Sequence, residues 1–301
     1  MPSKREVDVY KPLAYFAYFG YPLTVFEIWK WQLDPEVQMS LGEIERMLER
    51  SCWLRERLAF FQGFYAIGSQ EVVRNQVDER HRRYLDAIEK ERKLKRVLAY
   101  LRYLRGMSGA AVCNSLPFHF TSPKSDIDVF VITKPGVIWS TRFLSVGPLI
   151  ALAQRPGETQ RHPIDLSFFV SERQMDLFGY QKTDDPYFAY WVATLAPVLG
   201  EKSTWNRFFK ENAWAFSRLP NALPSQRAYR YALKSRRPLI PSLPETFAQR
   251  LQEHRLPQDL REAANDDSRV VIHRDMLKFH RTDRREEIAR AFKKQLEVCD
   301  V

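Results

Sequence analysis

Apolar residues in the N-terminal part of the chain recur in a way that predicts three short helices followed by a hairpin. An apolar segment at residues 13–16 comes before a stop at Gly20 and suits a short buried helix. Thr24 and Ser40 each stand three positions before a glutamate, which is the spacing of a capping box at a helix N-terminus. Residues 58–67 then form two apolar runs around a glycine, a pattern typical of a small hairpin.

Three helices and a hairpin are the parts of a winged helix, and residues 1–70 are therefore predicted to form a winged-helix-like module. A basic third helix would favour DNA binding, but residues 40–51 carry three glutamates against two arginines. DNA phosphates repel an acidic helix. Packing or the docking of a protein partner is therefore favoured over DNA recognition for this module.

A long helix is predicted from Glu71 to Arg105, because this stretch contains neither proline nor glycine. Its apolar residues recur at spacings of three and four. The outward positions, to which we assign Lys90, are rich in arginine and lysine with interleaved acidic residues. The segment is either an ordinary solvated helix with ion pairs along its surface or a basic rail leading to an active site. For any single arginine the first interpretation is favoured.

The pattern changes after Gly106 to short apolar segments typical of strands. Three strands are predicted, at residues 110–113, 127–132 and 163–170. A helix is expected between the last two, over residues 137–153, with a kink at Gly147-Pro148. Strand, strand, helix and strand in close succession indicate a compact α/β unit, to which we assign residues 106–183.

The last part of the chain, residues 184–301, is predicted to be mainly helical. Its expected helices lie at residues 187–214, around 227–235 and 245–252, and at 285–296. The stretch from Pro220 to Pro257 is rich in proline and arginine, which predicts an irregular basic connector. A short apolar stretch at residues 270–272 precedes the last helix.

Composition adds an expectation about partners and compartment. The 301-residue chain has a formal net charge of +10, which favours a polyanionic partner such as nucleic acid, a nucleotide or an anionic membrane. No apolar run approaches the roughly 18 residues of a membrane span, and the N-terminus lacks the apolar stretch of a secretory signal. The three cysteines have neither paired nor metal-ligand spacing. We therefore expect a cytoplasmic protein with no membrane partner.

Three aspartates carry the candidate chemistry. Asp126 and Asp128 stand two positions apart at a predicted strand, so their side chains share one face. Two such carboxylates repel each other unless a cation lies between them, and oxygen ligands suit Mg²⁺ or Mn²⁺. Asp165 begins another apolar strand and would complete the site as a second-metal ligand or as a base toward an acceptor hydroxyl.

The surroundings of these aspartates sharpen the pattern. An upstream strand ends in Asn114-Ser115, a loop follows, and Ser125 directly precedes Asp126. Together with the later carboxylate, Asp165, this arrangement resembles the DNA polymerase beta-like nucleotidyltransferase superfamily, especially its minimal members. The resemblance covers residues 108–170 and agrees in spacing from Ser115 through Asp128.

The resemblance implies both a reaction and roles for these residues. Ser115 would hold a terminal phosphate of a nucleoside triphosphate, with Asn114 and Ser125 also at the nucleotide. Asp126, Asp128 and Asp165 would be catalytic and would bind the metal, Mg²⁺ or Mn²⁺. A hydroxyl would attack the α-phosphate in line, with loss of pyrophosphate.

The sequence departs from the superfamily pattern at two positions. Asn114 replaces the usual glycine, although asparagine tolerates a left-handed backbone better than most residues. His119 replaces a second glycine that is common in the loop, and it is either a donor to the triphosphate or incidental. Lys124 and Arg142 are further candidates for phosphate contacts, and each is as readily an ordinary surface charge.

We therefore expect an α+β protein in which a nucleotidyltransferase-type mixed sheet is flanked by a winged-helix-like module and a helical C-terminal region. The expected activity is metal-dependent transfer of a nucleotide from a nucleoside triphosphate to an acceptor hydroxyl. Net charge, the basic helix and the basic connector favour RNA as the acceptor, and a protein acceptor stays open. The alternative is a non-catalytic nucleic-acid-binding or regulatory protein that retains the fold.

Overall fold

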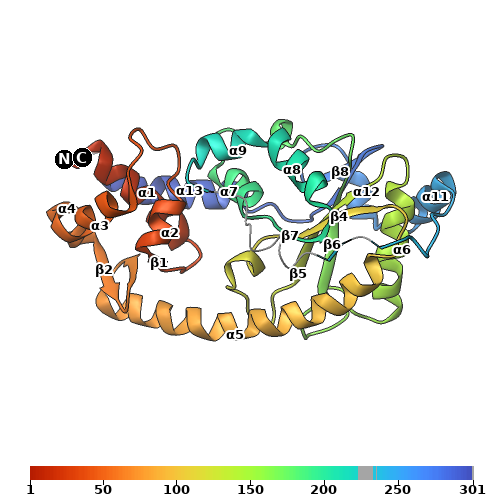
Figure 1. Ribbon diagram of the computed structural model, residues 1–301, viewed down its shortest axis with the longest axis horizontal. Helices are drawn as coiled ribbons and strands as arrows, with labels where there is room; N and C mark the ends of the chain where they lie inside the picture. Colours follow the sequence, from red (N-terminus) through yellow and green to blue (C-terminus); the bar gives the residue numbers. More distant parts are fainter. Residues whose placement is uncertain (223–232, 235, 300–301) are drawn as a thin grey trace.

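The chain forms two sheets that lie on one long helix (Figure 1). A computed structural model describes residues 1–222, 233–234 and 236–299. Within these residues the protein is mixed α+β, with one three-stranded sheet and one six-stranded sheet. The 32-residue helix α5 (Gln70–Leu101) runs from the smaller sheet to the larger one and connects the two parts.

The N-terminal part contains the predicted helices and hairpin. In chain order its elements are α1 (Lys4–Ala17), β1 (Leu23–Thr24), α2 (Val25–Lys30), α3 (Leu41–Arg50), α4 (Cys52–Arg57), β2 (Leu58–Phe61) and β3 (Phe64–Ile67). The capping boxes expected at Thr24 and Ser40 are both formed, which fixes where α2 and α3 begin. The additional short helix α4 has Ser51 as its N-cap, and the Ser51 hydroxyl accepts the amide hydrogen of Leu54 at 3.1 Å.

One face of α5 is buried along most of its length. The buried positions recur at helical spacing and are Val73, Val77, Ala87, Lys90, Leu94, Leu98 and Leu101. Lys90 is therefore on the inward face, and its assignment to the outward positions was wrong. It occupies a stripe position between two apolar residues, and its side chain is fully buried.

The larger sheet has the strand order β7-β4-β5-β6-β9-β8. Its strands are β4 (Met107–Val112), β5 (Ile127–Thr133), β6 (Ile164–Ser171), β7 (Ala196–Gly200), β8 (Val270–His273) and β9 (Met276–Phe279). β5 and β6 are parallel, and the crossover between them contains α6 (Ile138–Ala151). The other neighbouring pairs are antiparallel.

Three of these strands correct the prediction that residues 184–301 are helical. β7 interrupts the helix expected over residues 187–214, and β8 and β9 form a hairpin before the last helix. Pro197 made β7 hard to recognise, but proline is tolerated there because β7 is an edge strand. β8 and β9 are only four residues each and lack a glycine-containing turn, so the sequence pattern was too short to identify them.

The helices that follow the central strands agree more closely with the prediction. They are α7 (Pro186–Thr194), α8 (Lys202–Glu211), α9 (Ala213–Arg218), α11 (Glu245–Arg255), α12 (Gln258–Glu262) and α13 (Arg285–Leu296). The helix expected around residues 227–235 lies largely outside the described residues. No helix in the described part of the chain combines the length and apolar character needed to cross a membrane.

Helix α6 depends on side chains from distant segments at both of its ends. It continues through Pro148 without ending at the expected kink, and the Tyr100 hydroxyl donates to the Leu144 carbonyl at 2.8 Å. This is the carbonyl that proline, lacking an N–H, leaves unbonded. At the start of α6, Glu245 accepts the amide hydrogens of Trp139 and Ser140 at 2.8 and 3.0 Å. Because Val137 at the N-cap has no polar side chain, α11 supplies the cap.

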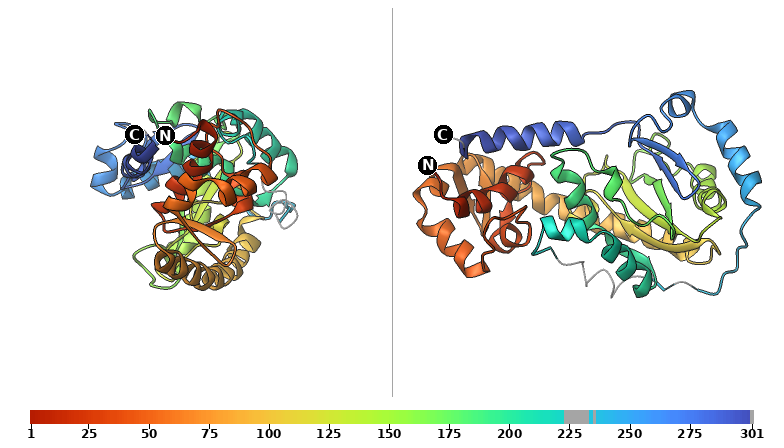
Figure 2. Two further views of the ribbon diagram at one scale, coloured as in Figure 1. Left: turned by 90° about the vertical axis from the view of Figure 1, so that its left-hand side faces the viewer. Right: turned by 90° about the horizontal axis from the view of Figure 1, so that it is seen from above.

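The C-terminal helix returns to the N-terminal part of the molecule. α13 lies beside α1 (Figure 2). The ring centroids of Tyr15 and Phe292 are 6.3 Å apart, and Ile288 is buried in the same apolar cluster. Tyr190 of α7 stacks on Tyr15 at 4.0 Å. The N-terminal part is thus attached to the rest by α5, α7 and α13 together.

The Glu245 cap gives a first testable prediction. Glu245→Ala should lower the free energy of unfolding by about 1 kcal/mol, because two amides at the start of α6 lose their acceptor. Urea unfolding followed by circular dichroism measures the change. Glu45→Ala, at an exposed position on α3, is the control and should change the free energy by less than about 0.5 kcal/mol. Equal effects of the two substitutions would contradict the capping role.

Candidate active site

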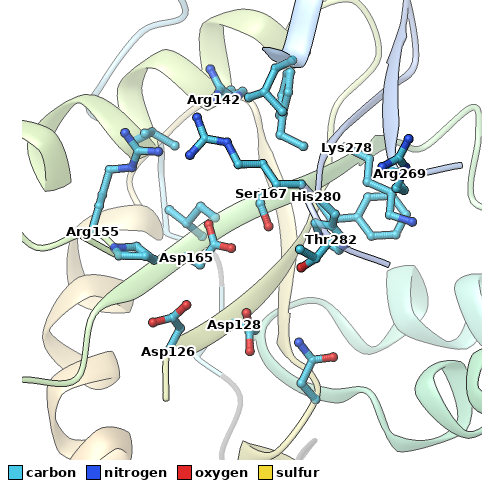
Figure 3. A pocket seen from close by; sticks show the side chains of 18 of the residues that line it. Asp126, Asp128, Arg142, Arg155, Asp165, Ser167, Arg269, Lys278, His280 and Thr282 are labelled. Atoms are coloured by element: carbon cyan, nitrogen blue, oxygen red, sulfur yellow. The ribbon is translucent and has the colours of Figure 1, made fainter. Parts of the chain in front are cut away.

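Two of the three aspartates singled out in the sequence lie on neighbouring parallel strands, and the third directly precedes one of them. Asp128 on β5 and Asp165 on β6 are direct partners in the ladder, so their side chains project from the same face of the sheet. Asp126 stands immediately before β5 and two positions from Asp128. All three line one large cleft, which we call the main cleft (Figure 3).

A bulge in β6 lies next to these carboxylates. Between the paired positions Asp128/Asp165 and Phe130/Phe168, β6 contains one more residue than β5. Bulges bend a strand and re-aim its side chains, and they are frequent beside active sites. Ser167, in the bulged segment, lines the main cleft and hydrogen-bonds the Asp165 carboxylate.

The opposite face of the same strands is apolar and holds the carboxylates in place. Ile127 and Val129 of β5 and Ile164 and Leu166 of β6 are all buried in a cluster with residues of α5 and α6. Because successive side chains alternate between the two faces of a strand, sliding either strand by one residue would bury the carboxylates in this cluster. The register that pairs Asp128 with Asp165 is therefore strongly specified.

The pKa values of all three aspartates are raised, chiefly because burial disfavours their charged forms. The pKa of Asp128 rises to about 7, through burial first and the neighbouring Asp165 carboxylate second. Burial also raises the pKa of Asp165, and the hydrogen bond from Ser167 opposes that rise. For Asp126 burial raises the pKa, and the Lys90 ammonium opposes it. A cation at this position would relieve the unfavourable charge on the carboxylates.

A buried polar cluster on α5 positions the segment before Asp126. Lys90 donates to the carbonyl of Ser125 and lies 3.7 Å from the Asp86 carboxylate. The Thr121 hydroxyl donates to the same carboxylate at 2.6 Å. Lys90 thus fixes the residue directly before Asp126 and places a positive charge behind the carboxylates.

The same face of α5 also fixes the segment before Asp165. His162 Nε2 is 3.0 Å from Asp86 Oδ1, and Lys93 donates to the His162 carbonyl at 2.8 Å. The loops that lead into β5 and β6 are therefore anchored to one helix. The basic helix predicted from the sequence acts here as a scaffold beneath the site.

Two residues of the loop after β4 have a left-handed backbone, and both stand where the superfamily pattern has glycine. Asn114 has a φ of 59° and His119 a φ of 51°. Asparagine and histidine tolerate this region better than most residues, so both departures from the pattern are compatible with the turn. The Asn114 side chain accepts the Tyr187 hydroxyl at 3.0 Å and hydrogen-bonds Asp128, which brings it to the carboxylates.

The other predicted nucleotide contacts are placed differently. Asn114 lines the main cleft, whereas Ser115 and Ser125 are not among its described lining residues. The Ser125 hydroxyl closes a turn by donating to the Ser122 carbonyl at 3.0 Å and accepting the Ser122 amide hydrogen. His119 is 3.0 Å from Glu91 on α5 and lines a smaller pocket beside the N-terminal part, away from the aspartates.

The main cleft has a volume of about 1220 Å³ and is rich in cations. Its basic lining residues are Arg142, Arg155, Arg255, Arg269, Lys278, Arg281, Arg284 and Arg285. Tyr18 and Phe19 of the N-terminal part also line it. A cleft of this size and charge has room for an anion as large as a nucleotide.

The three aspartate carboxylates supply only oxygen atoms as possible metal ligands. Three carboxylates on adjacent strands are the donor type that Mg²⁺ and Mn²⁺ prefer. Within the described residues, no group of three or more histidine, cysteine, aspartate and glutamate side chains is already arranged as a metal site. Mg²⁺ is commonly held by one or two carboxylates plus substrate phosphates, so the donor set fits a metal that arrives with a triphosphate.

Two important side chains of the site were missed or misassigned in the sequence. Lys90 could have been recognised by its position in the apolar stripe of α5, three residues after Ala87 and four before Leu94. Arg155 had no such signal, because only the packing of the loop after α6 brings it to the cleft. Arg142 does line the cleft, but Lys124 is exposed and is not among the described lining residues.

The raised pKa of Asp128 predicts how stability changes with pH. The folded protein favours the protonated carboxyl, so the free energy of unfolding should fall as pH rises from about 4 to about 7 and then level off. At pH 8 without divalent cations, Asp128→Asn should raise the free energy of unfolding by about 1–2 kcal/mol. Mg²⁺ should stabilise the wild-type protein more than this variant.

Chemical denaturation at pH 5 and pH 8, with and without Mg²⁺, measures these changes. Asp78→Asn, at an exposed position on α5, is the matched control and should behave as the wild type. Equal stability of wild type and Asp128→Asn at pH 8, with no difference in their response to Mg²⁺, would exclude an unfavourable charge at this site.

Comparison with known proteins adds no assignment to this geometry. No family model matches the chain, and no match was found among curated proteins or solved structures.

Proposed function

We propose that this protein is a metal-dependent nucleotidyltransferase that moves a nucleotide from a nucleoside triphosphate to an acceptor hydroxyl. The observation that carries the proposal is the pairing of Asp128 with Asp165 on parallel strands, with Asp126 two residues before Asp128. Such a group of carboxylates at a cation-rich cleft is suited to a divalent metal and a triphosphate. Lys90 and two arginines of the cleft act electrostatically on these aspartates, but within the described residues none of the three carboxylates forms an ion pair with them. A divalent cation would supply the missing partner.

The arrangement of the sheet supports a nucleotidyltransferase-type core. β4 leads into the left-handed turn at Asn114, β5 returns antiparallel to it with Asp128, and β6 follows in parallel with Asp165. This is the order that the sequence resemblance implies. The order of helices and strands in residues 1–70 likewise supports a winged-helix-like module, and we assign it to packing or partner docking because α3 carries three glutamates against two arginines.

A metal in this site would be held by Asp126, Asp128 and Asp165 together with phosphate oxygens. When bound, Mg²⁺ or Mn²⁺ would stabilise negative charge on the phosphates and lower the pKa of the attacking hydroxyl. The Asn114 amide, hydrogen-bonded to Asp128, orients that carboxylate toward the cleft. Lys90, behind the carboxylates, lowers the pKa values of Asp126 and Asp128 and so favours the charged forms that a metal ligand needs.

Asp165 is placed to accept a proton. Its burial raises its pKa, so it is a better base than an exposed aspartate, and Ser167 holds one orientation of the carboxylate. In the proposed reaction the acceptor oxygen attacks the α-phosphorus and its proton goes to Asp165. The bond between the α-phosphorus and the bridging oxygen breaks, and pyrophosphate leaves.

RNA is the acceptor that we favour, because the net charge of +10 and the basic lining of the main cleft suit a polyanion. A protein hydroxyl is the other acceptor class. The alternative function is that of a non-catalytic nucleic-acid-binding or regulatory protein with the same fold. In that case nucleic-acid binding would depend on the arginines and lysines, and the three carboxylates would not be needed.

A transfer assay tests the proposed reaction. Each of the four α-labelled nucleoside triphosphates is incubated with the protein, Mg²⁺ or Mn²⁺, and either total RNA or total protein. Wild type should transfer label from at least one triphosphate, and Asp128→Asn should reduce the rate by roughly a hundredfold or more, because it removes a metal ligand.

Asp78→Asn serves again as the control and should retain wild-type transfer. Label transfer that Asp128→Asn does not reduce would contradict the assigned site. Absence of both transfer and metal-dependent triphosphate binding would favour the non-catalytic alternative.

A further inference from the structure

Three arginines on the α6 side of the main cleft have no carboxylate partner. Arg142, Arg155 and Arg255 line the cleft, and none of them forms an ion pair within the described residues. Other cations of the same cleft are neutralised: Arg281 is 2.8 Å from Asp259, and Arg285 is 2.7 Å from Asp283. The three unpaired arginines therefore contribute most of the uncompensated positive charge on this side of the cleft.

Arg142 is held rigidly although no anion neutralises it. Its guanidinium donates to Gln252 Oε1 at 2.6 Å and lies over the Phe279 ring, 4.4 Å from the centroid. Gln252 is itself buried and donates to the Trp139 carbonyl at 2.8 Å. Nε of Arg142 is buried and has no hydrogen-bond partner within the described part of the chain. A fixed guanidinium with a free donor is a preorganised site for an oxygen anion.

The charge on this arginine is unfavourable in the absence of an anion. Burial first and the positive charge of Arg155 second lower the pKa of Arg142 to about 10, and the Asp165 carboxylate opposes this shift. Leaving a buried charge without a partner is strongly destabilising in proteins. A bound anion would remove this penalty, so the arrangement is explained more readily by ligand binding than by stability.

The two sides of the carboxylate group differ chemically. Arg142 and Arg155 interact electrostatically with Asp165, whereas Lys90 acts on Asp126 and Asp128, and Asn114 contacts Asp128. In Figure 3, Arg142 and Arg155 lie toward α6, and His280 and Thr282 lie on the other side of Asp165. The unpaired arginines thus adjoin the carboxylate that we assign as the base toward the acceptor.

We propose that Arg142, Arg155 and Arg255 form a subsite that binds a backbone phosphate of a nucleic-acid acceptor next to its attacking hydroxyl. This inference rests on the proposed function, because Asp165 defines which side of the cleft faces the acceptor. Arginine donors bind phosphate oxygens in pairs and so fix both position and orientation. An acceptor without phosphates, such as a protein hydroxyl, would leave these three arginines unpaired.

Binding of a short single-stranded RNA with a free 3′-hydroxyl tests the subsite. Arg155→Gln and Arg255→Gln are the variants, because Arg155 is only partly buried and Arg255 is exposed, so both should fold. Fluorescence anisotropy at several salt concentrations should show about five- to tenfold weaker binding for each variant. The salt dependence should lose a slope of about 0.7 for each phosphate contact removed.

The matched control is Arg281→Gln, which removes the same charge from the same cleft at a position already paired with Asp259. It should bind the RNA nearly as the wild type does. Calorimetry with Mg²⁺ and each of the four nucleoside triphosphates should show no loss of affinity for Arg155→Gln or Arg255→Gln.

Wild-type RNA affinity in both variants would overturn the proposal, as would failure of the wild-type protein to bind the RNA. Loss of triphosphate affinity instead of RNA affinity would also overturn it, because the arginines would then bind the nucleotide. Arginine-dependent RNA binding without any triphosphate binding would support the subsite and refute the proposed transfer reaction, so the two failures are distinguishable.

Discussion

Two carboxylates held side by side on β5 and β6 repel each other, and much of the surrounding structure keeps them together. The parallel ladder pairs Asp128 with Asp165, and the apolar residues between them are buried against α5 and α6. A change of register would bury charge in that apolar cluster, so the position of the carboxylates follows from the hydrophobic packing beneath them. The free energy of apolar burial thus stabilises an arrangement of charges that is unfavourable on its own.

The long helix α5 helps to hold this pair of strands in place. Its apolar stripe covers the sheet, and its buried polar residues, Asp86 and Lys90, fix the loops that enter β5 and β6. At the other side of the site, α11 caps α6 through Glu245 and holds Arg142 through Gln252. Segments more than a hundred residues apart therefore determine the chemistry of one cleft. This explains why an acidic group and a set of unpaired arginines can face each other without collapsing into ion pairs.

Local pattern was sufficient to predict the centre of the fold but not its edges. β5 and β6 are long apolar segments, and the spacing of Asp126 and Asp128 on such a strand placed both on one face. β7, β8 and β9 are short, and they are strands only because a neighbouring edge is available to pair with them. Capping boxes at Thr24 and Ser40 were readable because they depend on residues three positions apart. The inward position of Lys90 could be read from the apolar stripe of α5, whereas Arg155 reaches the site only through tertiary packing and its sequence neighbours do not indicate it.

We propose that the three aspartates and the phosphates of a nucleoside triphosphate together hold one divalent metal ion. A titration with Mn²⁺, followed by electron paramagnetic resonance, measures free and bound metal directly, with and without a non-hydrolysable triphosphate analogue. We expect the analogue to raise the affinity of the wild-type protein for Mn²⁺ by about tenfold or more, and Asp165→Asn to lose this increase. Mn²⁺ affinity that is independent of the triphosphate, or unchanged in Asp165→Asn, would contradict the account.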